Sequence, residues 1–265
     1  MSSSFSLAFW LASQPLAQSA VALIGAGFLI SLLGHYIVSQ YFTVAELQPN
    51  NLVGGFKYSF IAEVYAVTVA LCLVGSWEIY QNARDTVQRE AATMYFLLQS
   101  APVYGEPGQE GPRQAMELGV RNYAKAVVEK DWDNMRRGRT VGGSDPEFNL
   151  LVRAYLDVEP RTAAQQALQQ NTSQWLMQVS ELRINRLSSV SRTLTGLLWL
   201  LVVTSTGIVF VFPWFFGSPN QITQAIMGAL ASVTMTSVIL VAVKLAYPFA
   251  GEPLVTPGTF LTLMN

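Results

Sequence analysis

The chain has 265 residues, of which 51% are hydrophobic and 12% are charged, whereas an average soluble domain is about 25% charged. A net charge of −1 without a concentrated basic patch excludes the electrostatic footprint of a nucleic-acid-binding protein. The single cysteine, Cys72, and the single histidine, His35, exclude an intrachain disulfide and a zinc or iron site with several Cys or His ligands. We therefore expect neither a metal nor a cofactor.

Four apolar runs are each long enough to cross a bilayer as a helix, which takes about 20 residues. They occupy residues 20–42, 57–80, 194–216 and 221–247. Aromatic side chains flank the runs, as they do at membrane–water interfaces. The predicted fold class is therefore all-α, a polytopic membrane protein with four transmembrane helices in contact with the lipid bilayer.

The second apolar run continues into a charged stretch without a Gly-Pro break, so that residues 56–100 read as one helix. After the membrane part, apolar residues recur at steps of four and three, which places them on one helix face. They are Ala83, Val87, Ala91, Met94 and Leu98. About 43 helical residues at 1.5 Å each span roughly 64 Å, about twice the hydrocarbon core of a bilayer. Pro102 and Gly105 are expected to end this helix.

A polar segment separates the two apolar halves, because all lysines and arginines except Lys57 and Lys244 lie between Arg84 and Arg192. Three apolar stripes at helical spacing predict helices in this segment. The stripes are Met116, Val120, Tyr123 and Val127; Phe148, Leu151, Val152, Tyr155 and Leu156; and Leu168, Trp175, Val179 and Leu182. We expect an N-terminal helix pair in 1–80, a helical domain in 81–193, and a second membrane pair with a tail in 194–265.

Positive residues predict the orientation in the membrane. Arg84 and Arg89 follow the second span, and Arg183, Arg186 and Arg192 precede the third, whereas the opposite loops carry almost no positive charge. By the positive-inside rule, the helical domain and both chain termini are cytoplasmic.

Glu63 is the strongest candidate for a functional residue, because it lies about 9 Å inside the second span. A carboxylate there costs several kcal/mol unless it is protonated, paired or facing water. It is either a pore-lining or proton-binding group, or a protonated packing residue. The same predicted helix face carries Ser59, Ala66, Ala70, Leu73 and Trp77. Repeated around an oligomer axis, this face would form a polar mouth and a hydrophobic gate, and a ring of Glu favours cations.

Two other titratable groups lie in the apolar runs. His35, in the first span, is a candidate pH-sensitive partner of Glu63 or else a hydrogen-bonded structural histidine. Lys244, one turn from the end of the fourth span, is expected to snorkel to the interface. Small residues in the fourth span predict close helix packing. They are Ala225, Gly228, Ala229, Ser232 and Thr236.

The sequence does not favour an enzyme. It contains no Gly-rich phosphate loop and no Ser/His/Asp or Cys/His set outside the apolar runs, and no span contains the paired Asp of an intramembrane protease. Glu129, Asp131 and Asp133 are clustered but lack the Asp-x-Asp-x-Asp-Gly pattern of a calcium loop. We expect these three carboxylates to lie on a solvated helix face.

Short motifs along residues 45–262 resemble the bacterial bestrophin-like domain family, a group of unknown function. They are Asn50-Asn51, Tyr65-Ala66-Val67, Trp77-Glu78, Glu90-Ala91, Trp132, Arg186, Pro248-Phe249, Gly251 and Pro257. This family is distantly similar to bestrophins, which are homo-oligomeric ion channels. The resemblance implies that the second span lines a hydrophobic neck and continues as a long cytoplasmic helix. No acidic constellation matches a bestrophin calcium clasp.

Two function hypotheses follow. The first is a homo-oligomeric ion channel with the second span lining the pore and the permeant ion unassigned. The alternative is a non-conducting membrane scaffold or sensor whose helical cytoplasmic domain binds a partner. A proton-coupled transporter that uses Glu63 is a weaker third hypothesis, since four spans are few and no broken helix is evident.

Overall fold

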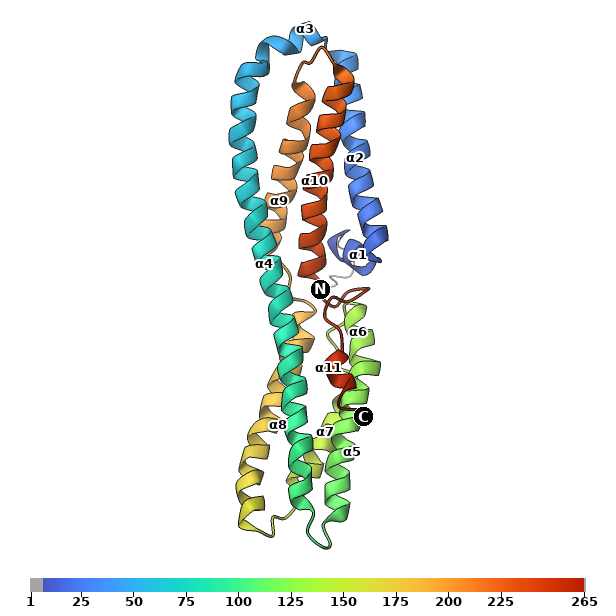
Figure 1. The fold of residues 1–265 in the computed structure, drawn as a ribbon, viewed down its shortest axis with the longest axis vertical. Coiled ribbons are helices and arrows are strands. Elements are labelled where there is room, and N and C mark those ends of the chain that lie inside the picture. Colours follow the sequence, from blue (N-terminus) through green and yellow to red (C-terminus); the bar gives the residue numbers. More distant parts are fainter. Residues whose placement is uncertain (1–6, 265) are drawn as a thin grey trace. The chain divides into compact units, whose positions relative to one another are not determined.

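The computed structural model describes residues 7–264, and within this range it contains helices, turns and no strand (Figure 1). The helices are α1 Leu7–Ser13, α2 Leu16–Tyr41, α3 Val44–Leu47, α4 Asn51–Ser100, α5 Glu110–Ala126, α6 Trp132–Arg136, α7 Asp145–Leu156, α8 Ala163–Ser189, α9 Gly196–Val211, α10 Gln221–Ala246 and α11 Gly258–Leu261. A π-helical segment, Val127–Asp131, joins α5 to α6. The predicted all-α class is confirmed.

Four helices are long and apolar enough to cross a membrane: α2, α4, α9 with its 3₁₀ extension, and α10. They match the four predicted spans to within a few residues at most ends. The second predicted span continues without interruption to Ser100, where a short 3₁₀ turn, Ala101–Tyr104, follows. The predicted long helix is therefore confirmed.

The helix α4 begins at Asn51, before the predicted start at residue 56, and therefore includes Gly54 and Gly55. A Cβ at Gly54 would lie 3.1 Å from the Phe216 ring, so the glycine leaves room for that ring. The Asn51 amide donates to the Gly217 carbonyl oxygen (2.6 Å) and accepts from the Gly217 N–H (3.0 Å). The Asn51 side chain thus provides hydrogen-bond partners for two backbone groups of a turn that is far away in sequence.

The chain divides into two compact units, and α4 contributes to both. The membrane unit comprises the described residues up to Glu78 together with Thr193–Ala246, and the polar unit comprises Ile79–Arg192 together with the tail from Tyr247. This tail is part of the predicted segment 194–265, together with the last two spans. It belongs to the polar unit because its apolar side chains are buried in that unit's core. They are Phe249, Val255, Phe260 and Leu263.

In the membrane unit, small residues bring α2 and α10 together, as the stripe on the fourth span predicts. A Cβ at Gly27 would lie 2.6 Å from Thr236 Cγ2, and one at Gly228 would lie 3.4 Å from Ser31 Oγ. A Cβ at Gly34 would overlap the Trp214 ring. The absent side chains thus permit close contact between helix backbones and their neighbours.

In the polar unit, the predicted stripes form a shared core with the buried face of α4. Met116, Val120, Tyr123 and Val127 are all fully buried. Leu156 is 48% exposed, contrary to the expected stripe, because α7 ends at this residue. The core therefore fixes the three predicted helices of this segment against α4.

Candidate functional site

Within the membrane unit, one face of α4 packs against the unit itself. The buried side chains on this face are Tyr65, Thr68, Cys72 and Ser76. About two turns before them, Tyr58 stacks on Phe212 with ring centroids 5.5 Å apart and meets Phe216 edge-on at 5.9 Å. The aromatic contacts and the spacing of three and four residues define the side of α4 that faces the other helices of the membrane unit.

The predicted pore face lies on a different side of the same helix. Ser59, Glu63, Ala66 and Ala70 are exposed, Trp77 is 50% exposed, and Leu73 is half-buried. The Glu63 carboxylate has no hydrogen bond or ion pair with any residue of the described part of the chain. A packing role for Glu63 within one subunit therefore has no contact to support it.

A third side of α4 is exposed and bulky. It carries Phe56, Phe60, Val64, Val67, Leu71 and Val74, each of them more than half exposed. On a helix with about 3.6 residues per turn, this apolar side lies next to the small and polar side that carries Glu63. The helix thus presents two chemically distinct surfaces that face away from the other helices of the membrane unit.

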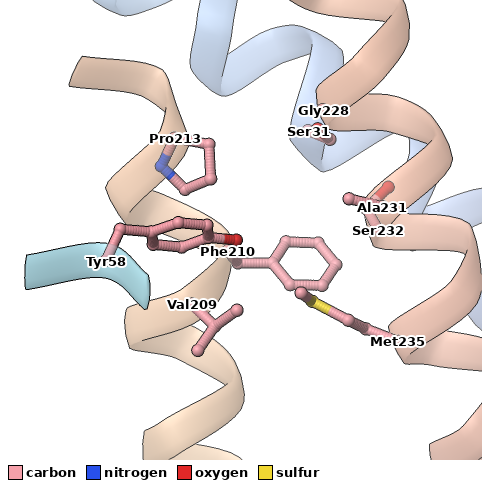
Figure 2. Close-up of a pocket in the computed structure, with 9 residues that line it drawn as sticks. All are labelled: Ser31, Tyr58, Val209, Phe210, Pro213, Gly228, Ala231, Ser232 and Met235. Carbon is pink, nitrogen blue, oxygen red and sulfur yellow. The ribbon is translucent and has the colours of Figure 1, made fainter. Parts of the chain in front are cut away.

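The interior of the membrane unit is tightly filled where its four spans approach one another. A cavity of about 10 Å³ is lined there by residues of α2, α4, α9, the 3₁₀ turn that follows α9, and α10 (Figure 2). The lining residues are Ser31, Tyr58, Val209, Phe210, Pro213, Gly228, Ala231, Ser232 and Met235. A space of this size holds about one water molecule. It is too small to pass a hydrated ion through the interior of this unit.

The other intramembrane polar groups lie away from Glu63. His35 lines a separate hollow formed by α2, α3 and the turn between α9 and α10, and no ion pair joins it to Glu63 in the described residues. Lys244 does not snorkel, contrary to expectation. It is buried, and its Nζ donates to the carbonyl oxygens of Ala12 (3.0 Å) and Gln14 (2.6 Å). These carbonyls lie at the end of α1, where a cation stabilises the helix terminus.

The polar unit contains a buried ion network that the sequence analysis did not predict. The Arg186 guanidinium on α8 donates to Glu90 on α4 through Nε (2.6 Å) and Nη2 (3.2 Å), and to Asp131 Oδ2 through Nη2 (2.9 Å). All three side chains are fully buried. The Trp132 and Phe260 rings lie 5.6 and 6.0 Å from the guanidinium carbon, within cation–π range. One arginine therefore links α4, the π-helical segment, α8 and the C-terminal tail.

Burial and neighbouring charges together shift the pKa values of Arg186 and Tyr123 in this network. Burial alone lowers the pKa of the Arg186 guanidinium, but the nearby Glu90, Tyr123 and Asp131 together outweigh it, so the net direction is upward. Burial and then the charge of Glu90 raise the pKa of the Tyr123 phenol well above its usual value. The Tyr123 hydroxyl therefore stays protonated and donates a hydrogen bond to Glu90 Oε1 (2.6 Å).

Asp131 does not lie on a solvated helix face, although its neighbours Glu129 and Asp133 are exposed. The π-helical segment has more residues per turn than an α-helix, which shifts the buried side toward Trp132 and Met135. Asp131 also accepts hydrogen bonds from the Gly143 N–H (2.7 Å), the Ser144 N–H (3.0 Å) and the Ser144 hydroxyl (2.8 Å). Its carboxylate thus fixes the start of α7.

A sequence signal for this network exists. Glu90 lies three residues after Val87 and four before Met94, in the middle of the apolar stripe of α4. A carboxylate inside such a stripe is buried when the helix packs, so it needs a buried cation. Nothing in the local sequence pattern identifies that cation as Arg186, which is 96 residues away.

Comparisons with known proteins place this geometry in context. The family model of the bestrophin-like domain matches residues 25–260. Two crystal structures of a bacterial bestrophin homologue from Klebsiella pneumoniae, each with a point mutation, match with a TM-score of 0.70. They are 10% and 11% identical, and each match covers 91% of this chain and 97% or 96% of the other. A crystal structure described as a membrane protein matches with a TM-score of 0.68 and 12% identity, covering 91% of this chain and 96% of that chain. At these identities the likeness establishes the fold. No curated protein matches.

Proposed function

The chain belongs to the bestrophin-like domain family, and we propose that it is one subunit of a homo-oligomeric ion channel whose pore is lined by α4. The observation that carries this proposal is the exposure of the Glu63 side of α4 in a single subunit. A carboxylate on the surface of a spanning helix is costly in lipid and is stabilised when it faces water. Symmetric assembly around this side would place Glu63 in an aqueous pore.

The small cavity inside the membrane unit supports the same assignment. Because about 10 Å³ cannot pass a hydrated ion, conduction requires a path formed between subunits and not within one. In such an assembly, Ser59 and Glu63 form a polar part of the pore, and Leu73 and Trp77 form a narrower apolar part. A ring of Glu63 carboxylates favours cations. The polar unit is then cytoplasmic in a bacterial inner membrane, with both chain termini on that side.

The test is the conductance of the purified full-length protein in planar bilayers under asymmetric salt, with and without Glu63→Gln. The expected result is discrete currents whose reversal potential moves away from the cation equilibrium potential in the variant, because the ring loses its charge. Glu181→Gln is the matched control, since Glu181 is an exposed carboxylate on α8 in the polar unit. Silence from protein that is folded and oligomeric would contradict the channel proposal.

A second candidate is a non-conducting scaffold or sensor, and one observation favours it. The polar unit exposes large apolar side chains on α4 and α8, with Tyr95 and Phe96 about half exposed and Met177 and Ile184 at 66% and 60%. Such residues are typical of a protein–protein interface. Capture of a specific protein by the wild type in detergent, lost in Met177→Gln and combined with absence of currents, would favour this candidate over the channel.

A further inference from the structure

A second hollow in the membrane unit lies where the end of α2, the short helix α3 and the turn between α9 and α10 meet. Its volume is about 20 Å³, which exceeds the about 10–15 Å³ that one water-sized molecule requires. Most of its wall is apolar, with Val38, Phe42, Val44, Leu47 and Phe216 among the lining residues. A hollow of this kind takes a single small occupant.

Two buried nitrogen atoms on lining residues of this hollow have no hydrogen-bond partner among the described residues. They are His35 Nε2 and Trp214 Nε1. The two residues lie close together because Trp214 packs its ring, including the carbon bonded to Nε1, against Gly34, the residue before His35. Buried polar atoms without a partner are rare in folded proteins, so two of them beside one hollow call for a common partner.

Of the other polar groups that line the hollow, those of Ser39, Gly217 and Ser218 already have partners, and Gln221 is an exposed residue. The Ser39 hydroxyl donates to the Tyr36 carbonyl oxygen (2.7 Å), and the Ser218 hydroxyl donates to the Asn220 carbonyl oxygen (3.3 Å). The Gly217 N–H and carbonyl are both paired with the Asn51 amide. The hydrogen-bonding capacity of His35 and Trp214 is therefore available to an occupant.

We propose that this hollow is a binding site for one hydrogen-bond acceptor with a single heavy atom, held between Trp214 Nε1–H and His35 Nε2. An indole nitrogen only donates, so the occupant must accept. A water molecule accepts from Trp214 and pairs with either tautomer of His35. A halide ion accepts from both, which requires the proton on Nε2. No residue of α4 lines the hollow, so the proposal does not rest on the proposed channel function.

Crystals of the full-length protein grown in sodium bromide test the proposal directly. An electron-density peak within hydrogen-bond distance of both nitrogens supports it. An anomalous bromide signal at that peak identifies the occupant as a halide, and its absence identifies water. Well-ordered His35 and Trp214 side chains without a peak between them would overturn the proposal.

Trp214→Phe tests the same site in solution, because it removes the donor and keeps an aromatic ring. If Trp214 Nε1–H is paired, its loss lowers the midpoint of thermal unfolding by about 2–4 °C, and the density peak disappears. If the nitrogen is unpaired, removing a buried donor leaves the midpoint unchanged or raises it, which would also overturn the proposal. Trp199→Phe is the matched control, since Trp199 is a half-buried indole on α9 that does not line the hollow.

Discussion

The two units bury their polar side chains in different ways. In the membrane unit, buried hydroxyl groups bond to backbone carbonyls of their own helix, as Ser232 does to Ala229 and Thr236 to Ser232. The buried Lys244 amine likewise bonds to backbone carbonyls, two of them beside α1, although these are far away in sequence. In the polar unit, side chains from segments far apart in sequence bond to one another around Arg186.

This difference reflects the two solvents. Between helices in lipid there is little hydrophobic driving force, so close packing of small residues holds them, and these polar side chains bond to backbone groups. In water, burial of apolar area drives association but does not by itself select one arrangement of helices. A buried ion network can favour one packing of the helices, because other packings would leave its charges without partners. Arg186, paired with Glu90 and Asp131, is such a network.

The largest expected effect comes from breaking the ion network. Arg186→Leu leaves the Glu90 and Asp131 carboxylates buried without their cation, and we expect a loss of about 3–5 kcal/mol in the free energy of unfolding. Arg137→Leu is the control, because its pair with Asp133 is exposed, and we expect a loss below about 1 kcal/mol. Denaturant unfolding monitored by circular dichroism measures both. Equal losses would contradict the expectation that the buried network matters more for stability than an exposed ion pair of the same unit.

The next effect tests close packing in the membrane unit. Gly34→Ala forces a methyl group into the Trp214 ring, and we expect a loss of about 1–3 kcal/mol from overpacking. Gly25→Ala, on the same helix, places its methyl group where no heavy atom lies within 4 Å. The control should be neutral or slightly more stable, since Ala is the better helix former. Thermal stability in detergent measures the pair, and an unaffected Gly34→Ala would show that α2 and Trp214 repack without cost.

The smallest effect concerns a surface pair of the polar unit and its dependence on pH. The hydrogen bond from Lys130 holds the pKa of Glu147 below its usual value. A lowered folded-state pKa contributes stability above the unfolded value of about 4.3, and this contribution is lost as the pH falls through the folded-state value. Because Lys130 is half exposed, we expect only about 0.2–1 kcal/mol, reduced further by salt.

Glu147→Gln measures this contribution when unfolding is followed from pH 7 down to pH 3. The difference from the wild type should be present at pH 7 and vanish at the acidic end. A difference that grows on acidification would have the wrong sign and would contradict the assignment.

Much of the fold could be predicted because its signals are local. Hydropathy over about 20 residues identifies each span, and steps of three and four residues identify the buried stripe of α4. The exposure of Glu63 was not predictable in this way. Periodicity groups Ser59, Glu63 and Ala66 on one side, but only the positions of α2, α9 and α10 determine whether that side is covered.

The errors have the same physical origin. Lys244 was expected to reach the interface because a lysine near a helix end usually does, but the carbonyls beside Gln14 lie within its reach in the folded chain. Asp131 was expected to share the solvated surroundings of its neighbours in sequence. A π-helical turn and the buried Arg186 give it a different environment, and a regular helical projection contains neither.

The sequence by itself determined that this is a helical membrane protein with four spans, a long second helix and a polar segment between two apolar halves. These properties depend on composition and on periodicity along one stretch of chain. Only the tertiary structure decided which side of α4 is free, which cation meets Glu90, where the C-terminal tail packs, and which polar atoms share the hollow beside His35. Each of these depends on segments far apart in sequence meeting in space, and local patterns carry no information about such meetings.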